Sequence, residues 1–239
     1  MKKARLQWRS VMRSGNVPGV VAVAAAVALL AGCDSSDCIT CSSGDVRSGR
    51  LATESRSVEG FSAVSIHGAG ALTVQHTGYE SLEITAEDNI LPLLESEVRG
   101  GRLVLGPVPG SSISATLPIE YRLTVRTLDD IEVSGASAVV VPDLDNEHLS
   151  VVISGASAVT LAGRAAVQAV AVSGASSYAA PDLRSRIATV DVSGASAAVV
   201  RASESLEGSV SGSSVLEYLG EPVVLLTVTG SSTLRHLER

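Results

Sequence analysis

Apolar and polar residues alternate along most of the chain, and one short motif interrupts this alternation at regular intervals. Val133-Ser-Gly-Ala-Ser137 is the first of six copies, whose first residues are 20, 19, 20, 18 and 18 positions apart. Apolar residues recur at every second position before and after each copy, as at Ile131 and Val133 or at Val139 and Val141. A period of two residues is typical of half-buried β-strands, so each repeat predicts two short strands joined at the glycine. The other copies begin at Ile153, Val172, Val192, Val210 and Val228.

The regular spacing of the motif bears on the architecture of the whole domain. In an antiparallel meander each motif would be a hairpin, and identical small residues in register would have no purpose. In a parallel solenoid each motif residue lies on its counterpart in the next coil. The spacing is also too short for a βαβ unit, and no helical pattern lies between the copies. We therefore predict an all-β fold, a parallel β-helix (β-solenoid) with coils of about 18–20 residues.

The glycine of each copy is predicted to form a corner of the coil. A tight bend needs a positive φ or a close approach of two backbones, and glycine tolerates both. The Ser or Thr before the glycine fills a column in which hydroxyl groups are expected to hydrogen-bond along the stack. A degenerate earlier copy is present at Ile66-His-Gly-Ala-Gly70. The six predicted corner residues are Gly135, Gly155, Gly174, Gly194, Gly212 and Gly230.

The section before the repeats also alternates, and glycines separate its apolar stretches. The segment Asn89–Val98 is predicted to form one short helix from the spacing of Ile90, Leu93 and Leu94. Polar residues at the end of the last coil, from Arg235 to Arg239, predict a polar end cap. The strands predicted in the first section cover residues 61–66, 71–75, 82–86 and 102–105.

The first 32 residues have the pattern of an export signal. Basic residues precede an apolar run from Val20 to Leu30, which is too short to remain as a membrane-spanning helix. The run ends at Leu30-Ala31-Gly32-Cys33, which resembles the lipobox of bacterial lipoproteins. We therefore predict a lipoprotein signal peptide over residues 1–32 and lipid attachment at Cys33. An ordinary secretory signal that ends near a cysteine is the alternative.

Residues 33–57 are predicted to be the lipidated cysteine followed by a flexible tether, because they are rich in Ser and Gly and lack apolar periodicity. Cys38 and Cys41 lie in this tether with C-x-x-C spacing. In an oxidising compartment they are candidates for a disulfide, with a redox pair or half of a metal site as alternatives. The folded domain is predicted to span residues 58–239.

The charge of the predicted mature protein is strongly acidic. The whole chain has 18 basic and 25 acidic residues, for a net charge of −7. Residues 1–32 contain five basic residues and no acidic ones, so their removal leaves 18 − 5 = 13 basic residues and a net charge of 13 − 25 = −12. This charge argues against nucleic acid or anionic lipid as a partner.

No residue pattern predicts catalysis, a metal site or a cofactor. The Ser-Gly-Ala-Ser copies do not extend to the G-x-S-x-G motif of serine hydrolases, and six equivalent nucleophiles would not form one active site. Asp129-Asp130 and Asp143-x-Asp145 do not match a calcium-binding loop. No pair of histidines has the spacing of metal ligands, and they are predicted to lie at the surface or in turns: His67, His76, His148 and His236.

Several motifs, taken in their order, resemble one known family. They are Phe61-x-x-Val64-x-Ile66-x-Gly68, residues 83–89 running into Val98-x-Gly-Gly-x-Leu103, the Ser-Gly-Ala-Ser series, and Leu216-Glu-Tyr-Leu-Gly-Glu-Pro222. Together they resemble the family described as putative auto-transporter adhesin, head GIN domain, over about residues 58–239. The resemblance implies a β-helix-like fold and a location in the cell envelope, and it brings no catalytic residues.

These observations favour a non-catalytic lipoprotein of the cell envelope, facing the periplasm or the cell surface. Its flat faces of Ala, Ser and Val are expected to act as an adhesin or binding surface. The expected partners are a membrane, through the lipid anchor, and a glycan or an envelope protein.

Two alternatives remain open at this stage. The first is an envelope sensor or accessory protein, because Asp34 directly after Cys33 resembles the signal that retains lipoproteins in the inner membrane of enteric bacteria. The second is a polysaccharide-active enzyme, since such enzymes are often β-helices. The candidate carboxylates Glu132 and Asp191 fall three repeats apart, which argues against a glycosidase pair.

Overall fold

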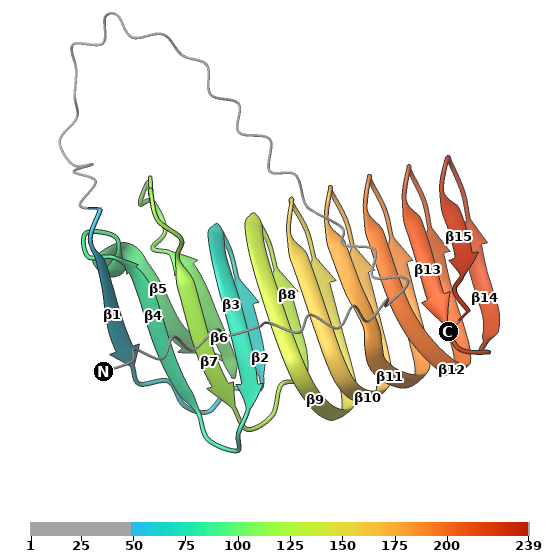
Figure 1. The fold of residues 1–239 in the computed structure, drawn as a ribbon, viewed down its shortest axis with the longest axis horizontal. Coiled ribbons are helices and arrows are strands. Elements are labelled where there is room, and N and C mark those ends of the chain that lie inside the picture. Colours follow the sequence, from blue (N-terminus) through green and yellow to red (C-terminus); the bar gives the residue numbers. More distant parts are fainter. Residues whose placement is uncertain (1–48, 239) are drawn as a thin grey trace, which may run out of the picture. The chain divides into compact units, whose positions relative to one another are not determined.

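A computed structural model describes residues 49–238, and this part of the chain is almost entirely β-structure (Figure 1). The N-terminal elements are β1 (Leu51–Arg56), β2 (Ala63–Ile66), β3 (Ala69–His76), β4 (Ser81–Glu87), the 3₁₀ helix η1 (Leu91–Leu93), β5 (Leu94–Arg99), β6 (Arg102–Pro107) and β7 (Glu120–Val125). The repeats form β8 (Asp130–Val133), β9 (Ala136–Ile153), β10 (Ala158–Val172), β11 (Ser177–Val192), β12 (Ala197–Val210), β13 (Val215–Leu219), β14 (Val223–Val228) and β15 (Thr233–His236). Within residues 49–238, no helix has the length and apolar character needed to cross a membrane.

Each coil consists of a strand that enters the glycine corner and a strand that leaves it. Strands that leave the corner form what we call the outbound sheet, in the order β1-β4-β7-β3-β9-β10-β11-β12-β13-β15. Strands that enter the corner form the inbound sheet, in the order β5-β6-β2-β8-β9-β10-β11-β12-β14. β9 to β12 are long because each continues around the bend opposite the corner and so takes part in both sheets. All pairings among β8 to β15 are parallel, which confirms the predicted β-solenoid.

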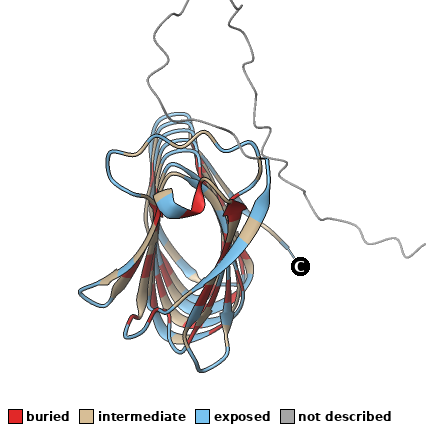
Figure 2. Cartoon of the chain, turned by 90° about the vertical axis from the view of Figure 1, so that its left-hand side faces the viewer, coloured by how far each residue is buried: buried red, intermediate tan, exposed pale blue. Residues whose placement is uncertain are grey.

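The hydrophobic core lies between the two sheets, which face each other when the stack is viewed from its N-terminal end (Figure 2). Alternate residues of each strand point inward, so the two-residue period of the sequence becomes columns of stacked side chains. One such column contributes a residue from each of five coils, and each of these side chains is at most 1% exposed. Its members are register partners along the inbound sheet: Val133, Ile153, Val172, Val192 and Val210.

The corner glycines allow the coils to stack at close range, as the sequence predicts. All six have φ between 71° and 84°, a left-handed conformation that residues with a Cβ rarely adopt. A Cβ built on Gly174 would lie 2.4 Å from the carbonyl oxygen of Gly155 in the coil before it. That carbonyl also accepts a hydrogen bond of 2.8 Å from the backbone N–H of Ala175. Both the conformation and the close approach therefore require glycine.

Hydroxyl groups hydrogen-bond from coil to coil through the second Ser of the motif, and we call this column the hydroxyl ladder. The prediction that the first Ser of the motif would form it is wrong. The Ser157 hydroxyl donates to the Gly135 carbonyl oxygen at 3.3 Å and accepts from the Ser137 N–H at 3.5 Å. The second Ser of each of the first five copies is buried. In the first column, the Ser173 hydroxyl alone among the described residues bonds to the coil before it. The second Ser points inward because the corner turns the chain by that point.

The degenerate copy at residues 66–70 forms the coil directly before the first full copy of the motif. Gly68 has φ of 86°, and a Cβ built on Gly135 would lie 2.3 Å from the Gly68 carbonyl oxygen. The four strands predicted before the repeats are also present as β2, β3, β4 and β6.

Two predictions for the N-terminal section are wrong. Residues 51–56, assigned to the tether, form β1 and pair antiparallel with β4, so the folded domain begins before Val58. The expected helix at Asn89–Val98 is only one 3₁₀ turn followed by β5. Gly100 and Gly101 both have positive φ, which closes β5 and β6 into a two-residue hairpin, and this long-range pairing outweighs a weak helical pattern.

The polar end cap is present in β15 but not in β14. Arg235 and His236 are exposed on β15, as expected. In contrast, β14 consists of Val-Val-Leu-Leu-Thr-Val, and Val223, Leu225 and Val228 are exposed. The last coil is therefore apolar on its inbound side.

Replacing one corner glycine tests whether the close approach of two coils requires glycine in addition to the left-handed conformation. We expect Gly174→Ala to lower the free energy of unfolding by about 2 kcal/mol or more, because it adds a clash to the left-handed conformation. Gly78→Ala is the matched control, since Gly78 has φ of 80° and no atom of another part of the chain lies within 4 Å of an added Cβ. It should cost only about 1 kcal/mol. Urea unfolding followed by circular dichroism measures both, and equal losses would contradict the close-approach argument.

The position of the hydroxyl ladder can be tested with two serines of one motif copy. Ser157→Ala removes two hydrogen bonds and should cost about 1–2 kcal/mol of unfolding free energy. Ser154→Ala should change it by less than about 0.5 kcal/mol, because its side chain makes no hydrogen bond to another described residue. Thermal unfolding measures both variants. A greater loss of unfolding free energy for Ser154→Ala than for Ser157→Ala would show that the first Ser of the motif forms the ladder.

Candidate functional site

The outward side of the outbound sheet carries two columns of small, uncharged residues. The residues within each column are register partners on neighbouring strands. We call the two columns together the small-residue face. The first column contains Ala71, Ala138, Ala158, Ser177, Ala197 and Val215, and the second contains Thr73, Val140, Thr160, Ala179 and Val199.

The small-residue face is long and bordered by charge. It crosses β3 and β9 to β13, which at about 4.8 Å per strand gives a length of roughly 24 Å. All of its side chains are exposed or half-buried. Arg122 pairs with Thr73 at one end, and Glu217 pairs with Val199 at the other. The face therefore has room for an extended partner and presents no charge that binding would have to desolvate.

The outward side of the inbound sheet has a different character. Arg102 forms ion pairs with Asp130 at 2.8 Å and Glu132 at 3.3 Å. Further along, the Ser209 hydroxyl donates to the Asp191 carboxylate at 2.6 Å. Charged residues are thus spread over this face, and the two faces of the solenoid differ chemically.

A shallow pocket of about 390 Å³ lies at the bend opposite the glycine corners. Arg164 is the register partner of Asp145 in the coil before it and of Arg184 in the coil after it. Acidic and basic groups therefore alternate within a small area, where side chains of this kind can hydrogen-bond to hydroxyl groups of a ligand. The pocket is lined by Asp143, Leu144, Asp145, Gly163, Arg164, Asp182 and Arg184.

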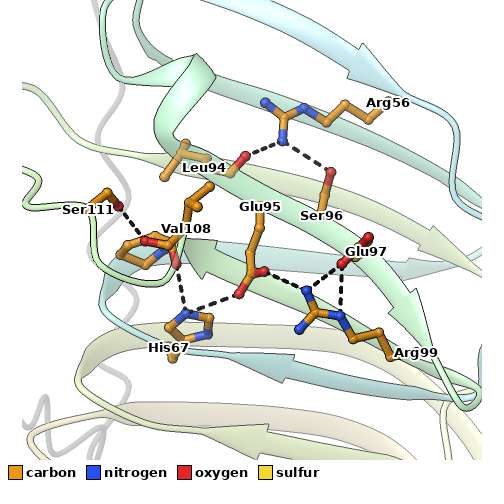
Figure 3. A network of polar contacts seen from close by, with 10 residues as sticks. Arg56, His67, Leu94, Glu95, Ser96, Glu97, Arg99, Val108 and Ser111 are labelled. Atoms are coloured by element: carbon orange, nitrogen blue, oxygen red, sulfur yellow. Dashed lines mark hydrogen bonds and ion pairs between the residues drawn. The ribbon is translucent and has the colours of Figure 1, made fainter.

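A polar network holds β1 against the N-terminal end of the solenoid (Figure 3). The Arg56 guanidinium donates to the carbonyl oxygens of Leu94 at 2.6 Å and Leu91 at 2.8 Å, and to the Ser96 hydroxyl at 3.1 Å. These bonds satisfy carbonyl groups around the end of η1. The segment predicted to be a tether is thereby fixed to the fold.

The same network contains a histidine beside a carboxylate, the kind of pair that acid–base enzymes use (Figure 3). His67 Nε2 lies 3.2 Å from the Pro107 carbonyl oxygen and 3.5 Å from Glu95 Oε1. Arg99 contacts the same carboxylate at 3.2 Å, and a hydrogen bond to Glu97 raises the pKa of Arg99. His67 Nε2 already contacts a backbone carbonyl oxygen and a carboxylate that is paired with Arg99. The cluster therefore links the turn after β2 to β5 and β6, which is a structural role.

A second polar cluster is buried inside the solenoid. The Gln168 side chain is fully buried and donates to the Ser185 hydroxyl at 2.9 Å and the Arg201 carbonyl oxygen at 3.3 Å. The Tyr178 hydroxyl donates to Gln168 Oε1 at 2.9 Å, and burial raises the pKa of Tyr178. Burial also raises the pKa of Tyr121 to about 12, with a smaller opposing effect of Arg56. These phenols stay protonated at neutral pH and fill the core.

The register of the inbound sheet confirms the predicted separation of Glu132 and Asp191. Val152 and Ala171 lie between them in one column. Three strand spacings give roughly 14 Å, whereas glycosidase carboxylates are about 5–10 Å apart. Among residues 49–238, no group of three or more His, Cys, Asp and Glu side chains is arranged to hold a metal ion.

The structure places the predicted functional residues as follows. The six corner glycines are brought into one stacked column. Cys33, Cys38 and Cys41 lie outside the described residues, so lipid attachment and the disulfide remain predictions. Sequence reasoning missed the buried Gln168 cluster, for which a polar residue at an inward position of an alternating strand was the available signal.

Comparison with known proteins identifies the family. Residues 60–222, more than half of the chain, match the family described as putative auto-transporter adhesin, head GIN domain. The chain belongs to this family, as its motifs predict. No curated protein matches the chain.

Solved structures from other bacteria have the same fold. A putative adhesin from Bacteroides fragilis NCTC 9343 has a TM-score of 0.63 and 22% identity, and one from Parabacteroides merdae ATCC 43184 has a TM-score of 0.53 and 16% identity. A putative lipid binding protein from Parabacteroides distasonis ATCC 8503 has a TM-score of 0.50 and 16% identity. Each match covers 80% of this chain and 98% of the other. At these identities the similarity establishes the fold.

Proposed function

We propose that this chain is a non-catalytic, lipid-anchored adhesin of the cell envelope that binds an extended partner through its small-residue face. The partner is a glycan strand or an elongated envelope protein. The chain faces the periplasm or the cell surface and is held to a membrane by lipid at Cys33.

The observation that carries this proposal is the absence of charge along the small-residue face. Charged residues make up 18% of the sequence, yet the two columns hold none between Arg122 and Glu217. A partner can therefore lie on the face without removing water from a charged group, which would cost free energy. The strands repeat at about 4.8 Å, which suits a partner that is itself repetitive or extended.

Membership of an adhesin family supports the same reading. The signal-peptide pattern ending at Leu30-Ala31-Gly32-Cys33 supports export and lipid attachment. The residues between Cys33 and β1 would then connect the lipid to the solenoid, leaving the small-residue face available to a partner.

A charge placed on the small-residue face should weaken binding. We expect Thr160→Lys to weaken binding to a glycan array or to envelope fractions at least about tenfold, equivalent to 1.4 kcal/mol, because a buried ammonium would lack a partner. Thr189→Lys is the matched control, since Thr189 is exposed in the same way on the inbound sheet. Equal losses for the two variants, or no binding by the wild-type chain, would refute the proposed face.

Lipid attachment at Cys33 can be tested in cells grown with labelled palmitate. The wild-type chain should incorporate label and fractionate with membranes, because the thiol of Cys33 is the acceptor for lipid. Cys33→Ser should lose both properties, whereas Cys38→Ser and Cys41→Ser should keep them. Label retained by Cys33→Ser would exclude the predicted lipobox.

A further inference from the structure

We propose that the C-terminal end of the solenoid joins a second copy of this chain, β14 against β14, in an antiparallel end-to-end dimer. This proposal does not depend on partner binding at the small-residue face. It arises from the difference between the two ends of the stack.

The C-terminal end leaves two strand edges open. β14 pairs with β12 and β15 pairs with β13, and no other described strand pairs with either. The outer edge of each strand therefore presents backbone N–H and C=O groups without a strand partner. An exposed edge of this kind is a template for a further strand.

The core is also uncovered at this end. Val224 and Leu226 point inward on β14, but both are half-exposed, whereas Leu206 in the coil before is fully buried. Val228 is 42% exposed, although its register partner Val210 is fully buried. Among residues 49–238, no further strand covers these columns beyond the last coil.

The outward residues of β14 are apolar as well. Val223 and Leu225 are 64% and 61% exposed, and their register partners in the coil before are Ser205 and Glu207. No charged residue or proline occurs between Val223 and Val228. These are the residue types that normally protect an edge strand from pairing. β14 therefore carries exposed apolar residues on both of its sides.

The N-terminal end does not offer a matching surface for this strand. Ile90, Leu91 and Leu94 close the core there, and Arg56 ties β1 to η1 and β5. The edge strand β5 carries Glu95, Glu97 and Arg99. A head-to-tail stack would place β14 against these charges, so the end of the molecule that fits β14 is β14 of another copy.

A two-fold axis between two copies would pair the open edge of β14 and cover the exposed end of the core. Two β14 strands related by a two-fold axis run antiparallel, so each supplies the hydrogen-bonding edge that the other lacks. The inward residues of the two copies then meet in one continuous core. No charged side chain lies on either strand, so two acidic domains can approach there. Lipid tails would cover the apolar residues but would leave the backbone groups without partners.

The test compares two lysine substitutions on the inbound sheet by sedimentation velocity of the purified full chain. All variants carry Cys33→Ser, so that lipid cannot cause association. The Cys33→Ser chain should sediment as a dimer. Leu225→Lys places like charges near the two-fold axis and should raise the dissociation constant at least about 100-fold, with an unchanged circular dichroism spectrum. Val152→Lys is the control in the middle of the stack, at a residue that is also exposed, and should remain dimeric.

Val223→Lys provides a second edge variant and should also be monomeric, which protects the test against misfolding of a single variant. Three results would overturn the proposal: a chain that is monomeric at every concentration, a dimer that both edge variants leave intact, or an open-ended series of oligomers. Co-purification of a different envelope protein with a monomeric chain would likewise overturn it, by showing another occupant of the edge. Thr160→Lys should leave the dimer unchanged, so failure of the adhesion proposal can be distinguished from failure of this one.

Discussion

The close approach of successive corner glycines is the constraint on which the rest of this fold depends. The Gly155 carbonyl oxygen accepts the Ala175 N–H at 2.8 Å and the Ser176 hydroxyl at 3.2 Å, and a Cβ on Gly174 would not fit beside it. This contact fixes the register between one coil and the next. Once the register is fixed, each inward residue stacks on its counterpart in the next coil, and each outward residue joins a column on the surface. The flat faces of the domain are thus a consequence of its corners.

The sequence predicts the repeats well because each strand there pairs with the same positions of the next repeat. A period of 18–20 residues and a two-residue alternation determine which residues stack and which face outward, including Val140 and Thr160 on the small-residue face. The sequence does not distinguish the two serines of each motif, because both are small and polar. Only the direction of the chain after the corner decides that Ser157 is buried and that Ser154 is not.

The N-terminal section is harder to predict because some of its pairings are antiparallel and join residues far apart in the sequence. Leu51–Arg56 has no apolar alternation strong enough to indicate a strand, yet it pairs with β4 about thirty residues later. Arg56 then satisfies the carbonyl groups of Leu91 and Leu94, which helps to hold the strand in place. For residues 89–98, the hairpin at Gly100-Gly101 outweighs the helical spacing, so local pattern and final structure disagree.

In a stack of similar coils, the repeat itself does not determine where the stack ends. The two ends of this stack differ in how their edge strands pair. At the N-terminal end, antiparallel strands change the direction of pairing, and charged side chains occupy the edge at Glu95, Glu97 and Arg99. At the C-terminal end the direction of pairing never changes, since β14 and β15 remain parallel to the coil before them. The repeat that builds the core therefore also produces an edge with the geometry of an interior strand. Such an edge can accept a further strand, and β14 carries no charged residue that would oppose the pairing.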